Sequence, residues 1–231
     1  MRFKPHCRFN RQISSTLFMA ALLLALGVRS ASADELAVWN FNDSDLVVDH
    51  GSGTLVTNFV AANVLFAAGT TNNARLGDTA GQALSLQGGT GNTNNGRNIT
   101  LNVSTLGFTN IIVSFAMQGT STGFNLNQFQ YSLDGINFTD FGAPFVPSTA
   151  FGTIPIVFTL SSIIGLNNNP NAAFRIVFNG ASSSTGNNRI DNVVVEGTAA
   201  PDTTIPEPST ALLLISGITG LVIKRKKRKA A

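Results

Sequence analysis

Hydrophobic and polar positions alternate along several stretches of the chain with the period of two that a half-buried β-strand requires. In the clearest stretch one face carries Ile111, Val113, Phe115 and Met117. Residues 98–103 and 174–179 alternate in the same way, with Arg175 on the polar face of the second. Each stretch predicts a strand with one buried face, and no helical periodicity of useful length appears between residues 35 and 198.

Turn-forming residues separate these strands. Asp134-Gly135 is the strongest hairpin signal in the chain, and residues 161–166 are expected to form one short helical turn. In residues 124–131 the apolar phase changes from even to odd positions at Gln128, which predicts a β-bulge or a strand that switches sheets. With about ten strands in all, the predicted fold of residues 34–200 is all-β, an antiparallel two-sheet sandwich of jelly-roll type.

The start of the chain has the pattern of a secretory signal peptide. Residues 1–11 are basic, residues 17–28 are apolar, and Ala31-Ser32-Ala33 fits the small-x-small pattern that signal peptidase cleaves. The apolar run is shorter than the roughly 20 residues that span a bilayer, which argues against an uncleaved anchor. Residues 1–33 are therefore predicted to form a signal helix and to be removed, leaving Asp34 as the first residue. Cys7, the only cysteine, would be lost with them.

The end of the chain combines a linker (201–204), a Pro-Glu-Pro motif, an apolar run that ends at Ile223, and a basic terminus. The basic residues are consecutive: Lys224, Arg225, Lys226, Lys227, Arg228 and Lys229. A helix over about 209–223 is about 22 Å long, and local thinning lets a bilayer accommodate it as a transmembrane helix. Because Lys and Arg favour the cytoplasmic side, both basic ends are expected inside and residues 34–200 outside.

This tail resembles the PEP-CTERM sorting signal, which bacteria with an outer membrane and exopolysaccharide systems carry on exported proteins. The resemblance covers about residues 205–229 of the terminal segment 205–231, and Pro206, Glu207 and Pro208 are its signature. It implies recognition and cleavage by an exosortase, with membrane anchoring through the C-terminal helix before processing. The final location implied is the cell surface, the outer membrane or the extracellular matrix. A plain tail anchor explains the helix and the charges but not the motif.

The distribution of charge reverses the first impression of a basic protein. The whole chain has a formal charge of +3, yet residues 34–205 hold four arginines against eleven acidic residues, a net charge of −7. Nucleic-acid binding depends on many Lys and Arg contacts to phosphates, so nucleic acid is excluded as a partner.

Little catalytic chemistry is visible between residues 34 and 223, which contain no Lys and no Cys and have His50 as the only histidine. Thiol and Schiff-base catalysis are thereby excluded. A Ser-His-Asp triad would need His50, which sits in a Gly-rich turn more typical of a solvated side chain. Two carboxylates acting on a glycan remain an open alternative, although most of the acids are expected to solvate the surface.

No cofactor is expected beyond a structural metal ion. Calcium is the metal that the oxygen-rich, cysteine-free inventory favours, with Asp43 and Asp191 as candidate ligands if the first and last strands pair. The alternative is a solvated turn at Asp43 and a capped strand end at Asp191. Trp39 shares a face with Ala37 and Phe41 and is expected to be buried, not to stack on sugar rings.

The opening segment 36–41 and the closing segment 189–195 resemble the first and last strands of jelly-roll domains in secreted proteins, including carbohydrate-binding modules. Together with the tail, they favour a non-catalytic surface or matrix protein that binds exopolysaccharide. The alternatives are a secreted glycan hydrolase with paired carboxylates and a membrane-retained protein whose tail is never cut.

Overall fold

The computed structural model describes residues 33–200. The predicted signal peptide up to residue 32, including Ala31, lies outside the described residues, and so do the Pro206-Glu207-Pro208 motif, the predicted helix over about 209–223 and the basic cluster 224–229. None of the helices in the described part is long and apolar enough to cross a membrane.

The described part is built almost entirely from β-strands. In chain order the strands are β1 (Ala33–Trp39), β2 (His50–Gly51), β3 (Thr54–Thr57), β4 (Val64–Ala68), β5 (Gln82–Gln87), β6 (Arg97–Asn102), β7 (Phe108–Gly119), β8 (Leu126–Ser132), β9 (Phe138–Asp140), β10 (Ile156–Thr159), β11 (Ala173–Asn179) and β12 (Asn187–Ala199). Three short 3-10 helices interrupt them: η1 (Ala61–Asn63), η2 (Thr90–Asn92) and η3 (Ile164–Leu166).

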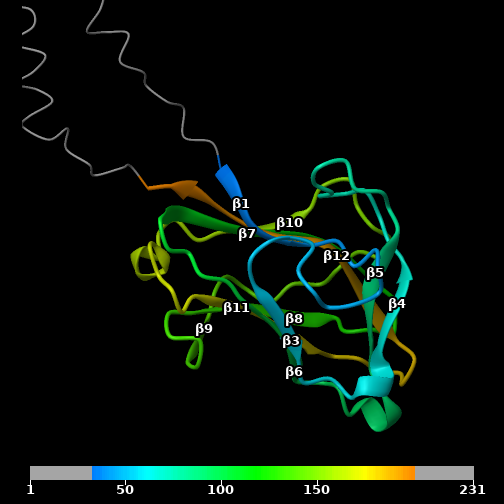
Figure 1. Cartoon of the computed structure of the whole chain (residues 1–231). Coiled ribbons are helices and arrows are strands. Elements are labelled where there is room, and N and C mark those ends of the chain that lie inside the picture. Colours follow the sequence, from blue (N-terminus) through cyan, green and yellow to red (C-terminus); the bar gives the residue numbers. More distant parts are fainter. Residues whose placement is uncertain (1–32, 201–231) are drawn as a thin grey trace, which may run out of the picture.

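The strands form two antiparallel sheets (Figure 1). The seven-stranded sheet has the order β10-β7-β12-β1-β2, with β5 pairing β12 and β4 pairing β5. The five-stranded sheet has the order β3-β6-β11-β8-β9. Most connections pass from one sheet to the other, as they do in jelly rolls, and the predicted all-β fold with two antiparallel sheets is confirmed.

The core lies between the two sheets, where the predicted apolar faces meet. Ile111, Val113 and Phe115 of β7 are fully buried, as the alternation predicts. Phe129 of the five-stranded sheet stacks on Phe158 of the seven-stranded sheet, with ring centroids 3.9 Å apart. Each large apolar side chain buried in this way stabilises the fold by about 1.5–3 kcal/mol, so the two sheets hold each other in place.

Neither the bulge nor the change of sheet predicted at Gln128 is found, since β8 stays in the five-stranded sheet. Strand β8 pairs with β11 without a register shift, from Ser132 opposite Ala173 to Leu126 opposite Asn179. Leu126 is half exposed and Asn127 is fully buried in its place. The amide of Asn127 donates to the carbonyls of Phe124 (3.1 Å) and Phe145 (3.2 Å), and these bonds offset the cost of burying a polar group.

Two local predictions are confirmed. Strands β8 and β9 form a hairpin around Asp134-Gly135, with residues 133–137 as its loop. The short helical turn expected in residues 161–166 is η3.

Candidate functional site

The outer face of the five-stranded sheet carries a row of side chains that crosses all five strands. The strand register places Val56, Thr100, Arg175, Gln130 and Asp140 side by side, and these five residues are called the outer row. Their neighbours along each strand, such as Leu101 and Phe174, point into the core. The row therefore follows from the period of two: burying the apolar face of each strand turns the polar face outward.

Side chains within the outer row fix one another. Arg175 Nε donates to Thr100 Oγ1 (3.1 Å), and Gln130 Nε2 donates to Asp140 Oδ1 (2.8 Å). The Arg175 guanidinium carbon lies 3.4 Å from the ring centroid of Phe138 on β9. Partial burial lowers the pKa of Arg175 from its ordinary value, but an arginine stays protonated at neutral pH.

This arrangement leaves hydrogen-bonding groups directed at solvent. The two terminal guanidinium nitrogens of Arg175 have no protein acceptor among the described residues, and the second carboxylate oxygen of Asp140 has no protein donor there. Donors and acceptors thus stand side by side on a fixed surface next to an aromatic ring. Such a surface suits a ligand whose edge carries several hydroxyl groups.

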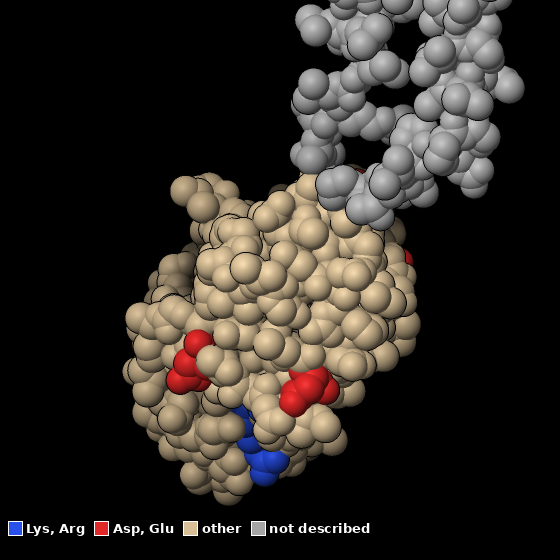
Figure 2. Space-filling model, turned by 90° about the vertical axis from the view of Figure 1, so that its left-hand side faces the viewer, with Lys and Arg blue, Asp and Glu red and all other residues tan. Residues whose placement is uncertain are grey.

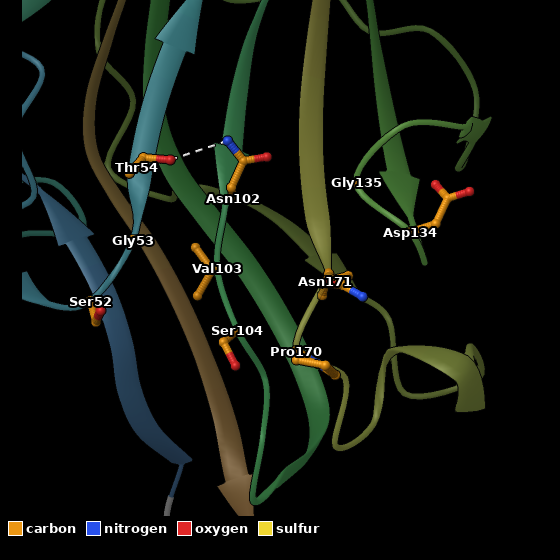
Figure 3. A pocket seen from close by; sticks show the side chains of 11 residues that line it. Ser52, Gly53, Thr54, Asn102, Val103, Ser104, Asp134, Gly135, Pro170 and Asn171 are labelled. Carbon is orange, nitrogen blue, oxygen red and sulfur yellow. Dashed lines mark hydrogen bonds between the residues drawn. The ribbon is translucent and has the colours of Figure 1, made fainter.

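A groove of about 420 Å³ opens at the end of the same sheet (Figure 3). It is lined by the start of β3, the end of β6, the β8–β9 loop and the segment that leads into β11: Ser52, Gly53, Thr54, Asn102, Val103, Ser104, Asp134, Gly135, Pro170, Asn171 and Ala172. Asn102 Nδ2 donates to Thr54 Oγ1 (3.1 Å) across two of these strands. The volume is in the range of small-ligand sites, and the lining is polar and apolar in about equal parts.

Asp134 is the one acidic residue that lines the groove. Its carboxylate accepts hydrogen bonds from Asn137 Nδ2 (2.7 Å), Asn137 N (2.7 Å), Ile136 N (2.9 Å) and Ser132 Oγ (2.9 Å). These bonds, those from Asn137 first, hold the pKa of Asp134 well below its usual range. The carboxylate is therefore ionised at neutral pH and engaged in shaping its own loop, which suits neither a general acid nor a general base.

Trp39 lies beneath the groove and is fully buried, as predicted from the sequence. A Cβ added to Gly53 would meet the Trp39 ring at 3.0 Å, so Gly53 lets the backbone just before β3 pass close over the indole. Trp39 supports the floor and presents no ring face to a ligand.

Asp191 and Asn192 mark the point where β12 changes neighbours from β5 to β1. Asn192 has a left-handed backbone (φ 48°), and the pairing with β7 shifts register between Asp191 and Val194. The loop between β4 and β5 fills the gap, since Asn192 Nδ2 donates to the carbonyls of Thr70 (2.7 Å) and Asn72 (2.9 Å). The Asp-Asn pair thus anchors this loop to the centre of the sheet.

Asp43 follows β1, and Asp191 lies in β12, the strand that pairs with β1. The first and last strands pair as expected, but the carboxylate of fully buried Asp191 accepts from Thr70 N (2.7 Å) and Asn192 N (2.8 Å). Burial raises the pKa of Asp191 to about 7, although these two hydrogen bonds act to lower it. Within residues 33–200 no three His, Cys, Asp or Glu side chains converge as a metal site.

Asp43 lies with Asp45 and Asp49 in the turn that precedes β2. Burial raises the pKa of Asp49 there, and the charges of Asp43 and Asp45 raise it further. His50 Nε2 lies 3.6 Å from Asp78 Oδ2, and its contacts within the described part include no serine hydroxyl. Residues 33–200 therefore contain no Ser-His pair arranged for nucleophilic catalysis.

Sequence reasoning missed the outer row as a site. The alternation in 174–179 placed Arg175 on the polar face, but nothing local to it indicated Phe138 or Gln130 as neighbours. The signal available in the sequence was Arg175 itself. It is a single arginine among apolar residues, in a segment (34–205) that has only four basic residues.

Comparisons with known proteins find a distant likeness to solved structures. The carbohydrate-binding module TmCBM61, in complex with β-1,4-galactotriose, is 13% identical with a TM-score of 0.41, covering 68% of this chain and 92% of that one. The CBM22-1 xylan-binding domain of Xyn10C from Paenibacillus barcinonensis is 10% identical with a TM-score of 0.44, covering 74% and 99%. The K3 cleaved adhesin domain of Lys-gingipain from Porphyromonas gingivalis is 13% identical with a TM-score of 0.43, covering 71% and 99%. No protein-family model and no curated protein matches the chain.

Proposed function

We propose that residues 34–200 form a non-catalytic polysaccharide-binding domain that acts at the cell surface or in the extracellular matrix, with exopolysaccharide as its partner. The observation that carries the proposal is the outer row, where Arg175, Gln130 and Asp140 present fixed hydrogen-bonding groups beside Phe138. A sugar ring has hydroxyl groups that donate and accept along its edge and an apolar C–H face. A site that binds such a ring therefore combines polar groups with an aromatic surface, as the outer row and Phe138 do.

Pre-organisation supports binding at this surface. Arg175 is held by Thr100 and Phe138, and Gln130 is held by Asp140, before any ligand arrives. Ordering a free rotamer-rich side chain costs about 0.5–1.5 kcal/mol, so side chains that are already ordered lose less on binding. The groove at the end of the sheet adds room for a further part of the chain of sugars.

The binding test uses the full chain and extracted exopolysaccharide in a co-sedimentation assay. Arg175→Ala and Gln130→Ala are expected to weaken binding at least severalfold. Arg75→Ala serves as the matched control and should bind like the parent. Arg75 is also partly exposed, but it pairs with Glu35 in the seven-stranded sheet. Thermal unfolding checks that each variant is folded. Unchanged binding by both outer-row variants would overturn the proposal.

We further propose that the protein is exported by its signal peptide and sorted by its PEP-CTERM tail. The fold supports this proposal, because Ala33 lies opposite Thr198 in the β1–β12 ladder and the two ends of the domain leave it side by side. The segments before and after the domain can therefore reach the same membrane. Signal peptidase cleavage between Ala33 and Asp34 removes one residue of β1 and leaves the pair Asp34–Gly197 intact. The resemblance to PEP-CTERM tails supports an exosortase as the second processing partner.

Deletion of residues 205–231 tests the sorting role directly. The deleted protein should lose its surface or matrix location in fractionated cells, while the intact chain reaches it. Intact-mass measurement of the exported protein should find Asp34 first and no basic cluster 224–229. A basic tail that survives in the exported protein would show that it is retained in the membrane.

A hydrolase with two carboxylates is the competing function. It requires two acids across a cleft, about 5–10 Å apart, one of them protonated at working pH. The groove contributes only Asp134, whose carboxylate is ionised and engaged by its loop, and Asp191 is fully buried. Release of reducing ends from extracted exopolysaccharide by the purified protein would favour the hydrolase.

A structural calcium ion at Asp191 is a second proposal, carried by one observation. A Cβ added to Gly69 would come within 3.0 Å of three oxygens: Asp191 Oδ2 and the carbonyls of Ala80 and Gln82. Carboxylate and carbonyl oxygens are what calcium binds, and a positive ion would balance the buried charge of Asp191. Because the Cα of Gly69 lies next to the point where these oxygens converge, Gly69 would have to shift for an ion to take them as ligands, with the two carbonyls in place of Asp43.

A further inference from the structure

The domain has an apolar end, made of four large aliphatic side chains in the loops where the chain termini leave. These are Leu106, Leu133, Ile136 and Ile164, which are 53%, 45%, 79% and 78% exposed, and they are called the apolar end. Leu106 lies between β6 and β7, Leu133 and Ile136 lie in the β8–β9 loop, and Ile164 begins η3. Exposed aliphatic residues are ordinary one at a time, but a group on adjacent loops marks an interaction surface.

Hydrogen bonds tie the three loops into one surface. Asn169 Nδ2 donates to the carbonyls of Leu133 (3.0 Å) and Gly165 (2.8 Å), which joins the β8–β9 loop to η3. The hydroxyl of Thr105 donates to the carbonyl of Leu166, and Gly107 N donates to Asn168 Oδ1 (2.8 Å). The polar side chains of these loops therefore point at backbone groups of the fold, and the aliphatic side chains are left outside.

Charge is nearly absent from these loops. Residues 104–107, 133–137 and 160–172 contain Asp134 and no other charged residue. Figure 2 views this side of the molecule and shows small patches of charged atoms on a surface that is mostly uncharged. A domain with a net charge of −7 over residues 34–205 thus carries a single charged residue in these three loops.

The route of the chain brings the apolar end to a membrane. Ala200 N donates to the carbonyl of Gly107 (2.7 Å), the residue after Leu106, so the chain leaves the fold beside this surface. The apolar run of the tail begins at Ala211. An extended chain covers at most about 3.3–3.6 Å per residue, so the bilayer stays within a few tens of ångströms of this surface.

We propose that the apolar end docks on the surface of a phospholipid bilayer while the tail anchors the protein, with Ile136 and Ile164 entering the interface. The inference rests on the proposed membrane helix in the tail, but not on polysaccharide binding. Because the outer row lies on a sheet face, docking leaves the outer row open to solvent, whereas the groove, which shares Asp134 and Gly135 with the β8–β9 loop, is brought close to the bilayer. The domain is then held with its binding face in a defined orientation to the membrane.

The test uses the full chain with Cys7→Ser, whose remaining residues contain no thiol. Single cysteines at Ile136→Cys, Ile164→Cys and the matched control Ile154→Cys carry an environment-sensitive fluorophore. Ile154 is as exposed as Ile136 (81% against 79%) but lies just before β10, away from the apolar end. The proteins are reconstituted in phosphatidylcholine vesicles with or without brominated acyl chains.

The expected result is blue-shifted emission and loss of most emission to brominated lipid at positions 136 and 164, with neither effect at 154. Equal, unquenched emission at all three positions in vesicles that carry the protein would overturn docking and leave the anchor intact. A blue shift that brominated lipid does not quench, and that disappears when the protein is diluted in lipid, would identify a second copy as the occupant and also overturn docking. Failure of the protein to float with vesicles would disprove the membrane helix and docking with it, whereas polysaccharide binding would be unaffected.

Discussion

The guanidinium of Arg175 lies over the ring of Phe138, 3.4 Å from its centroid, although the two residues are far apart in the sequence. The contact forms because β8 pairs with both β11 and β9, which brings the solvent faces of these strands together. It holds Arg175 in one orientation on the surface proposed to bind polysaccharide.

Phe138→Ala should weaken polysaccharide binding. The change removes a cation–π contact of about 0.5–1 kcal/mol and the ring beside the ligand, so the expected loss of affinity is about three- to tenfold. Isothermal titration with polysaccharide fragments measures it. Phe141→Ala is unsuitable as a control because Phe141 packs against the core, but Ile154→Ala on an exposed loop should leave affinity unchanged. Parent-like affinity of Phe138→Ala would remove this ring from the site.

The pKa of Asp191 predicts how stability depends on pH. Its folded value of about 7 lies above the value near 3.9 of an unfolded aspartate, so the folded state holds this proton more tightly. Its contribution to the free energy of unfolding is full below about pH 4 and is lost as the pH rises to about 7. Thermal unfolding from pH 4 to 8 should show this fall in the parent relative to Asp191→Asn, which has no such group to titrate.

If calcium binds at Asp191, it should restore the stability that the folded protein loses as the pH rises. At pH 8, added calcium should raise the melting temperature of the parent, chelator should lower it again, and Asp191→Asn should respond to neither. Asp43→Asn tests the other candidate ligand and should respond like the parent if the carbonyls of Ala80 and Gln82 take the place of Asp43. A parent protein that ignores calcium would exclude the ion from this site.

Asn188 should be among the most costly polar residues to replace. It is 1% exposed, its Oδ1 accepts from Phe124 N (3.1 Å), and its Nδ2 donates to Phe124 O (2.9 Å). Asn188→Leu leaves a buried N–H without an acceptor, which lowers the free energy of unfolding by about 2–4 kcal/mol in urea titrations. The neighbouring change Asn187→Leu should cost less than about 1 kcal/mol. Equal costs would mean that the bonds to Phe124 contribute little.

Arg75 should matter mainly at low salt. It lies 3.3 Å from Glu35 and 3.4 Å from Glu196, two carboxylates that stand opposite each other on β1 and β12. Arg75→Ala leaves these like charges facing each other and should lower the free energy of unfolding by about 1 kcal/mol or less. High salt should shrink the difference, and adding Glu35→Gln to the variant should recover part of it. A loss independent of salt would point to packing instead.

The pattern of residues predicted much of the fold because alternation is a local property. Strands β6, β7 and β11 lie where the period of two placed them, with Ile99, Phe115 and Phe174 buried as expected. The hairpin at Asp134-Gly135 and the short turn before Leu166 were also predictable from a few neighbouring residues. The bulge at Gln128 was not, since bonds from Asn127 to Phe124 and Phe145 decided which side chain is buried there.

By itself, the sequence determined the class of the domain, the faces of its main strands and the segregation of positive charge to its two ends, because composition and periodicity are properties of the chain alone. Only the tertiary structure decided which polar residues act together. The outer row, the groove and the anchoring of the β4–β5 loop by Asp191 all join residues that are distant in the chain. Their positions depend on strand order and register, which are set by packing of the two sheets against each other and not by any local pattern.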